Sequence, residues 1–389
     1  MGYIRPFMAS IKLNPGGRQR VLQGHPWVYA NEVQKVLGPE HDGKAVECRD
    51  SKGQFLATGL YNSCSQILWR KISSDKTVFD AAFLHPALEK AVKRRGDLQA
   101  GRLVWSESDG IPGLIVDRFG DVLVLQISTM GVEQQMESIL DWLEKKIKPS
   151  AIVLRNDAPL REKEGLERYL RVGRGTAPDP FWLNLGSVEF LFDWQSGQKT
   201  GFYLDQCEQH LRVAAYAKGR RVLDVFCNQG GFALHCAKAG ATSVTAVDSS
   251  SEAIAMAKKN ALQNGCEVKW ICENAFDYLK RQKAGSWDLV ILDPPPFAKS
   301  RDKLDEALRG YKEINLRAMK QLTSGGILAT YACSHHISYD LFRKMLSEAA
   351  VDAGRAARLL EICGQSHDHP VILGIPESEY LRGYILEIE

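Results

Sequence analysis

The chain lacks the paired cysteines of a disulfide framework or a structural zinc site. It has nine cysteines among 389 residues, an odd number, and no two of them form a C-x-x-C pair. Disulfides are rare in reducing compartments, and zinc fingers need closely spaced thiolate or imidazole ligands. We therefore expect reduced thiols, no metal ion and a cytoplasmic location.

Long apolar runs and nucleotide-binding loops are also missing. No window approaches the run of about 18 apolar residues that a membrane span requires, and residues 1–10 lack the apolar core of a signal peptide. The full G-x-G-x-x-G pattern and the lysine-containing phosphate loop are absent. These absences argue against a membrane protein, a kinase and a phosphate-loop hydrolase.

The composition is that of an ordinary globular protein. Hydrophobic residues make up 44% and charged residues 25%, and the formal net charge of +3 is too small to indicate a nucleic-acid partner. A chain of this length exceeds the size at which one core stops growing, so two or three domains are expected.

The pattern of residues changes twice along the chain. The first part has short β-type runs at 44–48, 55–61 and 66–70, separated by turn formers, which predict a small β-barrel. The middle part mixes helices at 79–95 and 132–146 with strands at 151–155 and 188–192 and a hairpin at 111–127.

From about residue 195, strand, glycine-bearing turn and helix repeat, which predicts βαβ units and a parallel sheet. We expect an α/β protein with three domains, at 1–75, 76–194 and 195–389.

Two short apolar runs in the last part of the chain end in residues whose side chains can take part in catalysis. Residues 288–292 lead to Asp293-Pro-Pro-Pro-Phe297, and residues 326–332 lead to Cys333. Ligands of open α/β sheets bind where parallel strands end. If the two strands are neighbours, Asp293 and Cys333 face one pocket, where a carboxylate stands beside a nucleophilic thiol.

A second set of residues marks a nucleotide-type site. Gly230 and Gly231 follow a strand that contains Asp224 and precede a helix, where glycine permits a tight turn and close ligand approach. Asp248 ends the next strand and is placed to accept hydrogen bonds from ribose. Asn274 follows a third strand and is the candidate contact to adenine. The alternative is that these are ordinary turn residues of a doubly wound sheet.

An ordered series of motifs spans the chain and carries a specific resemblance. The chain resembles the ribosomal RNA large subunit methyltransferase I family in these segments: Gly24-His-Pro-Trp-Val-Tyr29, Glu107-Ser-Asp-Gly-Ile-Pro-Gly-Leu114, Val116-Asp-Arg-Phe-Gly120, Lys199-Thr-Gly-Phe-Tyr-Leu-Asp-Gln206, Gly230-Gly-Phe232, Asp293-Pro-Pro, Arg309-Gly-Tyr-Lys312, Cys333-Ser334 and Asp368-His-Pro-Val371.

The resemblance implies a fold, a cofactor and a substrate. The fold would be an N-terminal PUA domain, a central α+β domain and a C-terminal Rossmann-like class I methyltransferase sheet. The cofactor would be S-adenosylmethionine, with Tyr203 and Asp205 as further contacts. The partner would be 23S ribosomal RNA or a large-subunit precursor, methylated at C5 of a cytosine.

That reaction gives roles to the strand-end residues. Cytosine C5 is a poor nucleophile, so we expect the Cys333 thiolate to add to C6 and Asp293 to hydrogen-bond the N3 and N4 edge. Phe297 either stacks on an unpaired target base or plugs the loop from below. In the first domain, Arg18 and Arg20 are candidates for phosphate contacts.

Two other functions are consistent with the sequence. An Asp-Pro-Pro-aromatic loop also resembles those that hold an exocyclic amine for direct N-methylation, which requires no cysteine. A non-catalytic RNA-binding or ribosome assembly factor is the second alternative. The sequence leaves open the target nucleotide, the proton-abstracting base, naked RNA versus an assembling subunit as substrate, and the oligomeric state, a homodimer included.

Overall fold

The computed structural model describes residues 9–38, 41–195, 200–297 and 303–389. Lys199, the first residue of the predicted cofactor segment, lies outside them. Contacts divide the chain into two compact units: the first contains Met1–Pro180, Asp193–Phe202 and Asp368–Ser378, and the second contains Phe181–Phe192, Tyr203–His367 and Glu379–Glu389. The three contiguous domains expected from the sequence stay a prediction, because each unit draws on several stretches of the chain.

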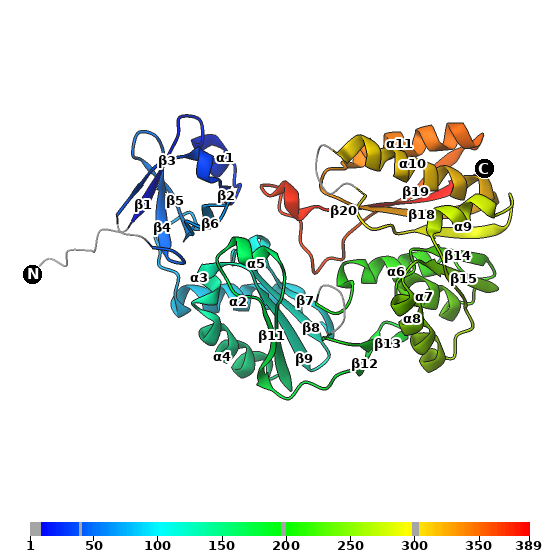
Figure 1. The fold of residues 1–389 in the computed structure, drawn as a ribbon, viewed down its shortest axis with the longest axis horizontal. Coiled ribbons are helices and arrows are strands. Elements are labelled where there is room, and N and C mark those ends of the chain that lie inside the picture. The colour runs from blue at the N-terminus through cyan, green and yellow to red at the C-terminus, as the bar shows by residue number, and fades with distance from the viewer. Residues whose placement is uncertain (1–8, 39–40, 196–199, 298–302) are drawn as a thin grey trace, which may run out of the picture. The chain divides into compact units, whose positions relative to one another are not determined.

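The first unit starts with a six-stranded mixed sheet in the order β2-β6-β5-β4-β1-β3 (Figure 1). Its elements are β1 (Ser10–Leu13), α1 (Arg18–Leu22), β2 (Trp27–Val28), β3 (Val33–Leu37), β4 (Ala45–Arg49), β5 (Phe55–Tyr61) and β6 (Trp69–Ser73). The predicted strands at 44–48 and 55–61 are confirmed. The run at 66–70 was placed too early, because the preceding turn is held by hydrogen bonds from Asn62 and Ser65 to Glu164.

Close packing around Trp69 explains one glycine of this sheet. The indole is fully buried and donates from Nε1 to the Val46 carbonyl oxygen at 2.9 Å. A Cβ at Gly59 would lie 2.4 Å from the indole ring. Only glycine fits opposite this side chain.

A five-stranded sheet in the order β11-β10-β9-β8-β7 completes the first unit. Its elements are α2 (Ala81–Arg95), β7 (Ala100–Trp105), β8 (Leu114–Phe119), β9 (Val122–Ile127), α3 (Met130–Glu133), α4 (Met136–Ile147), β10 (Ala151–Asn156), α5 (Leu160–Lys163) and β11 (Tyr169–Gly175). The hairpin predicted at 111–127 is the β8–β9 pair, and the two predicted helices correspond to α2 and α4.

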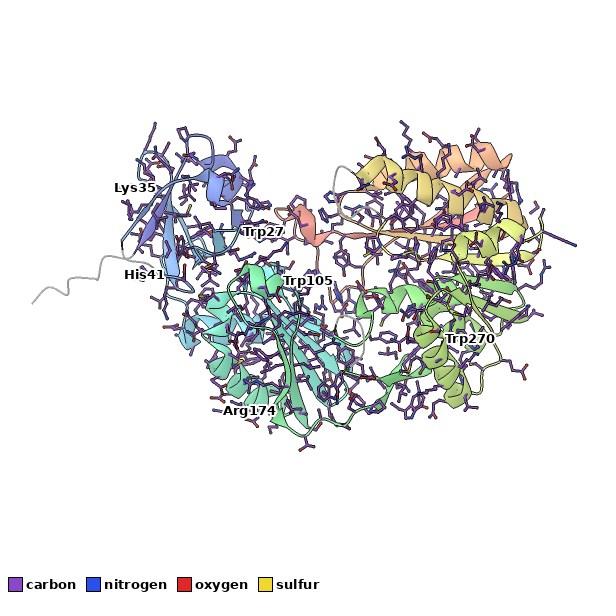
Figure 2. The ribbon with its side chains drawn as sticks, in the orientation of Figure 1. Trp27, Lys35, His41, Trp105, Arg174 and Trp270 are labelled. Atoms are coloured by element: carbon purple, nitrogen blue, oxygen red, sulfur yellow. The ribbon has the colours of Figure 1, made fainter. Side chains whose placement is uncertain are left out.

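Buried polar contacts tie distant segments to this sheet. Arg102 donates to both carboxylate oxygens of Asp117 at 2.7 and 2.8 Å, and Thr200 donates to the same carboxylate at 2.6 Å. The backbone N–H of Arg102 donates to Asp368 at 2.6 Å. Trp105, labelled in Figure 2, lies under the Arg102 guanidinium, 4.4 Å from it. Residues near 200 and 368 therefore belong to the first unit.

The second unit contains a hairpin of β12 (Phe181–Leu185) and β13 (Val188–Phe192) and a seven-stranded sheet in the order β16-β15-β14-β17-β18-β20-β19. The sheet strands are β14 (Arg221–Val225), β15 (Ser243–Asp248), β16 (Lys269–Cys272), β17 (Trp287–Leu292), β18 (Leu322–Cys333), β19 (Ala357–Gly364) and β20 (Leu381–Ile388). Strands β16, β15, β14, β17 and β18 are parallel to one another, and β20 is antiparallel to its neighbours β18 and β19. The predicted parallel sheet is confirmed.

Helices cover both faces of this sheet because alternate strand residues point to opposite faces. Leu223 belongs to the core under α9, α10 and α11, whereas Val222 belongs to the core under α6, α7 and α8. The helices are α6 (Cys207–Ala214), α7 (Gly231–Lys238), α8 (Ser251–Asn264), α9 (Ala275–Arg281), α10 (Leu304–Gln321) and α11 (Tyr339–Ala353). Within the described ranges, no helix is both long enough and apolar enough to cross a membrane.

The Arg102–Asp117 pair gives a test of the first unit. Both side chains are almost inaccessible, at 8% and 0%, so Asp117→Leu would leave a buried guanidinium without this carboxylate. We expect the free energy of unfolding to fall by about 3–5 kcal/mol, measured by urea denaturation. The exposed pair Lys303–Glu306 is the control, and Glu306→Gln should cost less than about 1 kcal/mol. A loss for Asp117→Leu as small as that of the control would contradict this account.

Candidate functional site

The centre of the second unit's sheet is the place where its strand order reverses. β14 pairs with β15 on one side and with β17 on the other, both in parallel. In open α/β sheets, ligands bind in the crevice outside the carboxyl ends of strands at such a reversal. Asp248 ends β15, and Asp293 directly follows β17, so both acids lie at this edge of the sheet.

The loop after β14 has an unusual backbone. Phe226 and Asn228 adopt φ values of 67° and 46°, in the left-handed region that non-glycine residues seldom occupy, and Gly230 follows with φ 91°. Such conformations persist where surrounding contacts fix them, and they concentrate at functional sites. Here the backbone N–H groups of Phe226 and Cys227 donate to the Val247 carbonyl oxygen at 2.9 and 3.1 Å.

Gly230 and Gly231 are glycines for separate reasons. The left-handed backbone of Gly230 favours glycine, and a Cβ there would also lie 2.8 Å from Trp270, which Figure 2 labels. Gly231 starts α7, and a Cβ on it would lie 2.6 Å from the His210 ring. Burial, with a smaller effect of His235, holds the pKa of His210 well below its usual value. Gly231 thus makes room for a neutral imidazole, which the sequence did not reveal.

Asp224 lies inside the protein and is not exposed to the crevice. Its carboxylate is fully buried and accepts a hydrogen bond from the Ala233 N–H at 2.9 Å, which fixes the first turn of α7. Burial is the largest of the effects that raise the pKa of Asp224 to about 8; the Ala233 hydrogen bond opposes this shift, and the charges of Asp293 and Asp248 add to it. The geometry gives Asp224 a supporting position behind the loop.

Asp248 connects the two loops at the crevice. Its Oδ2 accepts from the Asn228 N–H and its Oδ1 from the Ser250 N–H, both at 2.9 Å. Ser250 caps α8 by accepting from the Ala253 N–H at 3.1 Å. A carboxylate oxygen has more than one acceptor site, so Asp248 can still accept hydrogen bonds from a ligand.

Asn274 caps the N-terminus of α9. Its side-chain oxygen accepts from the N–H groups of Phe276 at 2.9 Å and Asp277 at 3.4 Å. The residue is exposed, and the cap directs its amide nitrogen away from the helix. Any contact from Asn274 to a base would therefore be a donated hydrogen bond.

Asp293 and Cys333 lie at the ends of neighbouring strands. β17 and β18 are parallel, with Leu292 opposite Thr330, and Cys333 is the last residue of β18. The two strands are therefore neighbours, as the expectation of one shared pocket requires. Asp293 accepts a hydrogen bond from Nε2 of Gln206 at 2.9 Å. Cys333 is half-buried.

Tyr203 shares the electrostatic environment of these residues. Burial is the largest of the effects that raise the pKa of its phenol to about 12, and the charges of Asp205, Asp293, Cys333 and Asp248 contribute to the same shift. The charges that contribute to this shift are all negative, and such surroundings suit a positively charged ligand.

Asp205 is anchored on its own side of the site. Its side chain accepts from the Tyr380 hydroxyl at 2.7 Å, and its carbonyl oxygen accepts from the N–H and hydroxyl of Ser366. Sequence reasoning missed Gln206, Ser366 and Tyr380, because contacts over more than 80 residues leave no pattern in the sequence.

Phe297 packs in an aromatic cluster. Its ring centroid lies 4.6 Å from that of Tyr311, 6.0 Å from Phe276 and 6.4 Å from Phe226. A Cβ on Gly310 would lie 3.2 Å from the ring. This packing is that of the hydrophobic plug, and stacking of Phe297 on a base stays a prediction.

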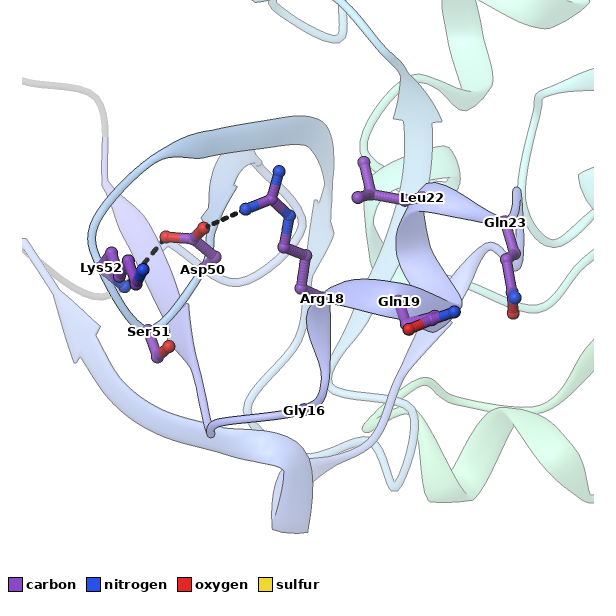
Figure 3. A pocket seen from close by; sticks show the side chains of 8 residues that line it. All are labelled: Gly16, Arg18, Gln19, Leu22, Gln23, Asp50, Ser51 and Lys52. Carbon is purple, nitrogen blue, oxygen red and sulfur yellow. Dashed lines mark hydrogen bonds and ion pairs between the residues drawn. The ribbon is translucent and has the colours of Figure 1, made fainter.

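The two predicted RNA-contact residues differ in their surroundings. Arg18 lines a pocket of about 440 Å³ beside Gln19, Leu22 and Lys52 (Figure 3). Its side chain is half exposed and pairs with Asp50 at 3.2 Å. Arg20 is instead paired with Glu32 at 2.9 Å and donates to a backbone carbonyl oxygen. Arg18 is the better placed of the two for a new anionic partner.

Comparison with known proteins identifies both parts of the chain. A family model described as a PUA-like domain matches residues 11–74, and one described as an S-adenosylmethionine-dependent methyltransferase matches residues 179–368. The chain is 39% identical to the ribosomal RNA large subunit methyltransferase I of Aeromonas hydrophila, over 97% of this chain and 99% of that one. The relative of the same name from Klebsiella pneumoniae is 36% identical, over 97% of both chains.

Solved structures show the same fold. A chain from Streptococcus mutans described as a SAM-dependent methyltransferase superposes with a TM-score of 0.82 at 17% identity, over 98% of this chain and 100% of that one. A methyltransferase structure complexed with SAH superposes with a TM-score of 0.83, also at 17% identity and with the same coverage. The expected combination of a PUA-like domain and a Rossmann-like methyltransferase sheet is confirmed.

The raised pKa of Asp224 has a consequence for stability. Because the folded carboxyl keeps a proton that the unfolded one has lost, wild-type stability should fall as pH rises from about 4 to about 8. Asp224→Asn keeps the oxygen that accepts from Ala233 and removes this dependence. We expect the variant to gain on the wild type by up to about 1.4 kcal/mol per pH unit in this range.

Urea denaturation without cofactor, repeated between about pH 5 and pH 8, measures this difference. Asp305→Asn, a change at an exposed carboxylate of α10, is the control and should give a constant offset. An equally constant offset for Asp224→Asn would show that Asp224 is ionised throughout.

Proposed function

The chain belongs to the ribosomal RNA large subunit methyltransferase I family, and from this premise we propose that it methylates C5 of a cytosine in 23S ribosomal RNA, with S-adenosylmethionine as the methyl donor. The observation that carries the proposal is the adjacency of Asp293 and Cys333 on parallel strands β17 and β18. It brings a carboxylate and a thiol to one end of the crevice.

The residues at this edge of the sheet suit the cofactor in charge and in hydrogen-bonding groups. S-adenosylmethionine carries a sulfonium cation, and Asp205, Asp248 and Asp293 all lie around Tyr203. Asp248 would accept from the ribose hydroxyls, and Asn274 would donate to adenine. Gly230 lets the loop approach the ligand, while Gly231 and Asp224 hold the loop and α7 in place.

The protein's own residues would activate the base. The Cys333 thiolate adds to C6, so that a C6–S bond forms and electron density moves to C5. Asp293 accepts from the N4 amine, and from N3–H once N3 has taken up a proton from solvent as the adduct forms. Bound S-adenosylmethionine would supply an electrophilic methyl group, to which C5 forms a bond as the bond between methyl and sulfur breaks. The C5 proton then passes to solvent or to a basic group, and N3 gives up its proton. The electron pair of the C5–H bond restores the C5–C6 double bond, and the C6–S bond breaks to release the Cys333 thiolate and 5-methylcytosine.

Transfer of labelled methyl groups to 23S RNA, followed by nucleoside analysis, tests this proposal. Cys333→Ala should lower the rate by at least about a thousand-fold, because no other group replaces the nucleophile. Cys266→Ala, which removes another half-buried thiol of the second unit, should leave the rate unchanged.

The result separates the three functions. Label in 5-methylcytosine that disappears with Cys333→Ala agrees with the adduct. Label in another nucleoside, or activity that survives the substitution, contradicts it and favours direct N-methylation. Cofactor binding without any turnover would favour an assembly factor.

For the first unit, we propose that the pocket of Arg18 and Lys52 holds RNA phosphates. Arg18 is on α1 and Lys52 is on the turn between β4 and β5, and both line the pocket. The amides of Gln19 and Gln23 lie beside them and can bond sugar or phosphate oxygens. Such contacts fix position on RNA without reading its sequence.

The salt dependence of RNA binding measures these contacts. Replacing both cations, Arg18→Gln with Lys52→Gln, should reduce the slope of log K against log salt by about 1–2, since each phosphate contact contributes nearly one. Arg20→Gln should change the slope less, because the Arg20 side chain is less exposed than that of Arg18, at 36% against 51%, and its guanidinium already donates to both Glu32 and the Trp27 carbonyl oxygen. An unchanged slope for the double variant would contradict the assignment.

A further inference from the structure

The three residues that follow Asp293 cannot orient its carboxylate through their backbone. A carboxylate at a strand end is commonly fixed by N–H groups of the next two or three residues. Positions 294, 295 and 296 are all proline, and proline has no N–H. A side-chain donor from another part of the fold can orient the carboxylate instead.

Gln206 supplies such a donor. Its Nε2 lies 2.9 Å from Oδ1 of Asp293, a contact between residues 87 positions apart. An ionised carboxylate only accepts hydrogen bonds, so the amide nitrogen must face it, and this determines the orientation of the amide.

The segment around Gln206 is held firmly. The carbonyl oxygen of Asp205 accepts from the N–H of Ser366 at 2.9 Å and from its hydroxyl at 3.0 Å. Gln209 donates to the carbonyl oxygen of Gly364 at 2.8 Å. These contacts attach the segment to the end of β19, so Gln206 approaches Asp293 from a fixed position.

Burial of the Gln206 side chain has a cost in folding free energy. The side chain is 4% exposed, and its Oε1 is buried without a hydrogen-bond partner among the described residues. A buried acceptor without a partner costs about 1–3 kcal/mol, whereas leucine or methionine would fill this space without that cost. Gln209 also has a buried Oε1 without a partner among the described residues, so what distinguishes Gln206 is its contact with Asp293.

We propose that Gln206 is the positioning residue for Asp293: its amide holds the carboxylate in the orientation that meets the target base. The inference rests on the proposed role of Asp293 in methyl transfer. Gln206 itself touches neither the base nor the reacting atoms, and it acts through Asp293 alone.

The first test removes the donor. Gln206→Leu should lower kcat for methyl transfer to 23S RNA by about 10- to 100-fold, with a smaller change in KM, because a misplaced catalytic group costs about that much. Gln209→Leu is the matched control. It also replaces a buried glutamine of this segment, but the amide of Gln209 donates to the carbonyl oxygen of Gly364. S-adenosylmethionine affinity by calorimetry and the melting temperature should be similar for both variants.

A second variant tests the positioning role even if Gln206→Leu folds poorly. Gln206→Glu keeps the size of the side chain but donates to Asp293 only when the pair holds a proton. Its kcat relative to wild type should rise as pH falls, which loss of packing alone would not produce. The titratable groups near the site are common to all variants: Tyr203, Asp205, Asp224, Asp248, Tyr311 and Cys333.

The outcomes separate the positioning role from the proposed reaction. Equal kcat for the two leucine variants, a pH-independent ratio for Gln206→Glu, or weakened cofactor binding with normal kcat would each overturn the positioning role. If wild type makes a nucleoside other than 5-methylcytosine, the cytosine proposal fails. The comparison between Gln206 and Gln209 variants would then still decide the positioning role on that product.

Discussion

The parallel register of β14, β17 and β18 is the constraint on which the site depends. Leu292 is paired with Val225 on one side and Thr330 on the other, so three strands end at one edge of the sheet. A slip of one residue would turn each side chain to the opposite face. The register is set by buried apolar residues on both faces, such as Val290 and Ile291. The chemistry of the edge is therefore determined by the packing of the core.

This edge concentrates negative charge, which has a cost. Asp224, Asp248 and Asp293 are close enough that the latter two raise the pKa of the first, in addition to the larger effect of burial. Backbone N–H groups offset part of the repulsion at Asp224 and Asp248. A bound cation would offset more, and a ligand that binds only the folded state stabilises it. The same charges that weaken the empty site would thus strengthen cofactor binding.

Part of the fold and of the candidate site could be predicted from the sequence, and part could not. Apolar runs and their terminal residues were enough to place β17, β18, Asp293 and Cys333, because a buried parallel strand leaves a continuous local signal. Local signals also gave the β8–β9 hairpin. The imidazole of His210 under Gly231, the Gln206–Asp293 contact and the docking of Asp368 on Arg102 each join residues far apart in sequence. No periodicity or turn chemistry records such contacts, so only the fold reveals them.

The two strand-end groups are positioned by different means. Cys333 is still within the sheet, opposite Leu381 of β20, so backbone pairing places its Cβ. Asp293 stands one residue beyond β17, before three prolines; its N–H donates to the Val225 carbonyl oxygen at 3.4 Å, and the paired residues of β14 and β17 end at Leu292. Its backbone is stiffened by the prolines, but its carboxylate can still rotate about the side-chain bonds. A thiol that must form a bond at one carbon needs only a fixed Cβ and one torsion. A carboxylate that must align with the edge of a planar base needs its plane set as well, and this is what a side-chain amide such as that of Gln206 can supply.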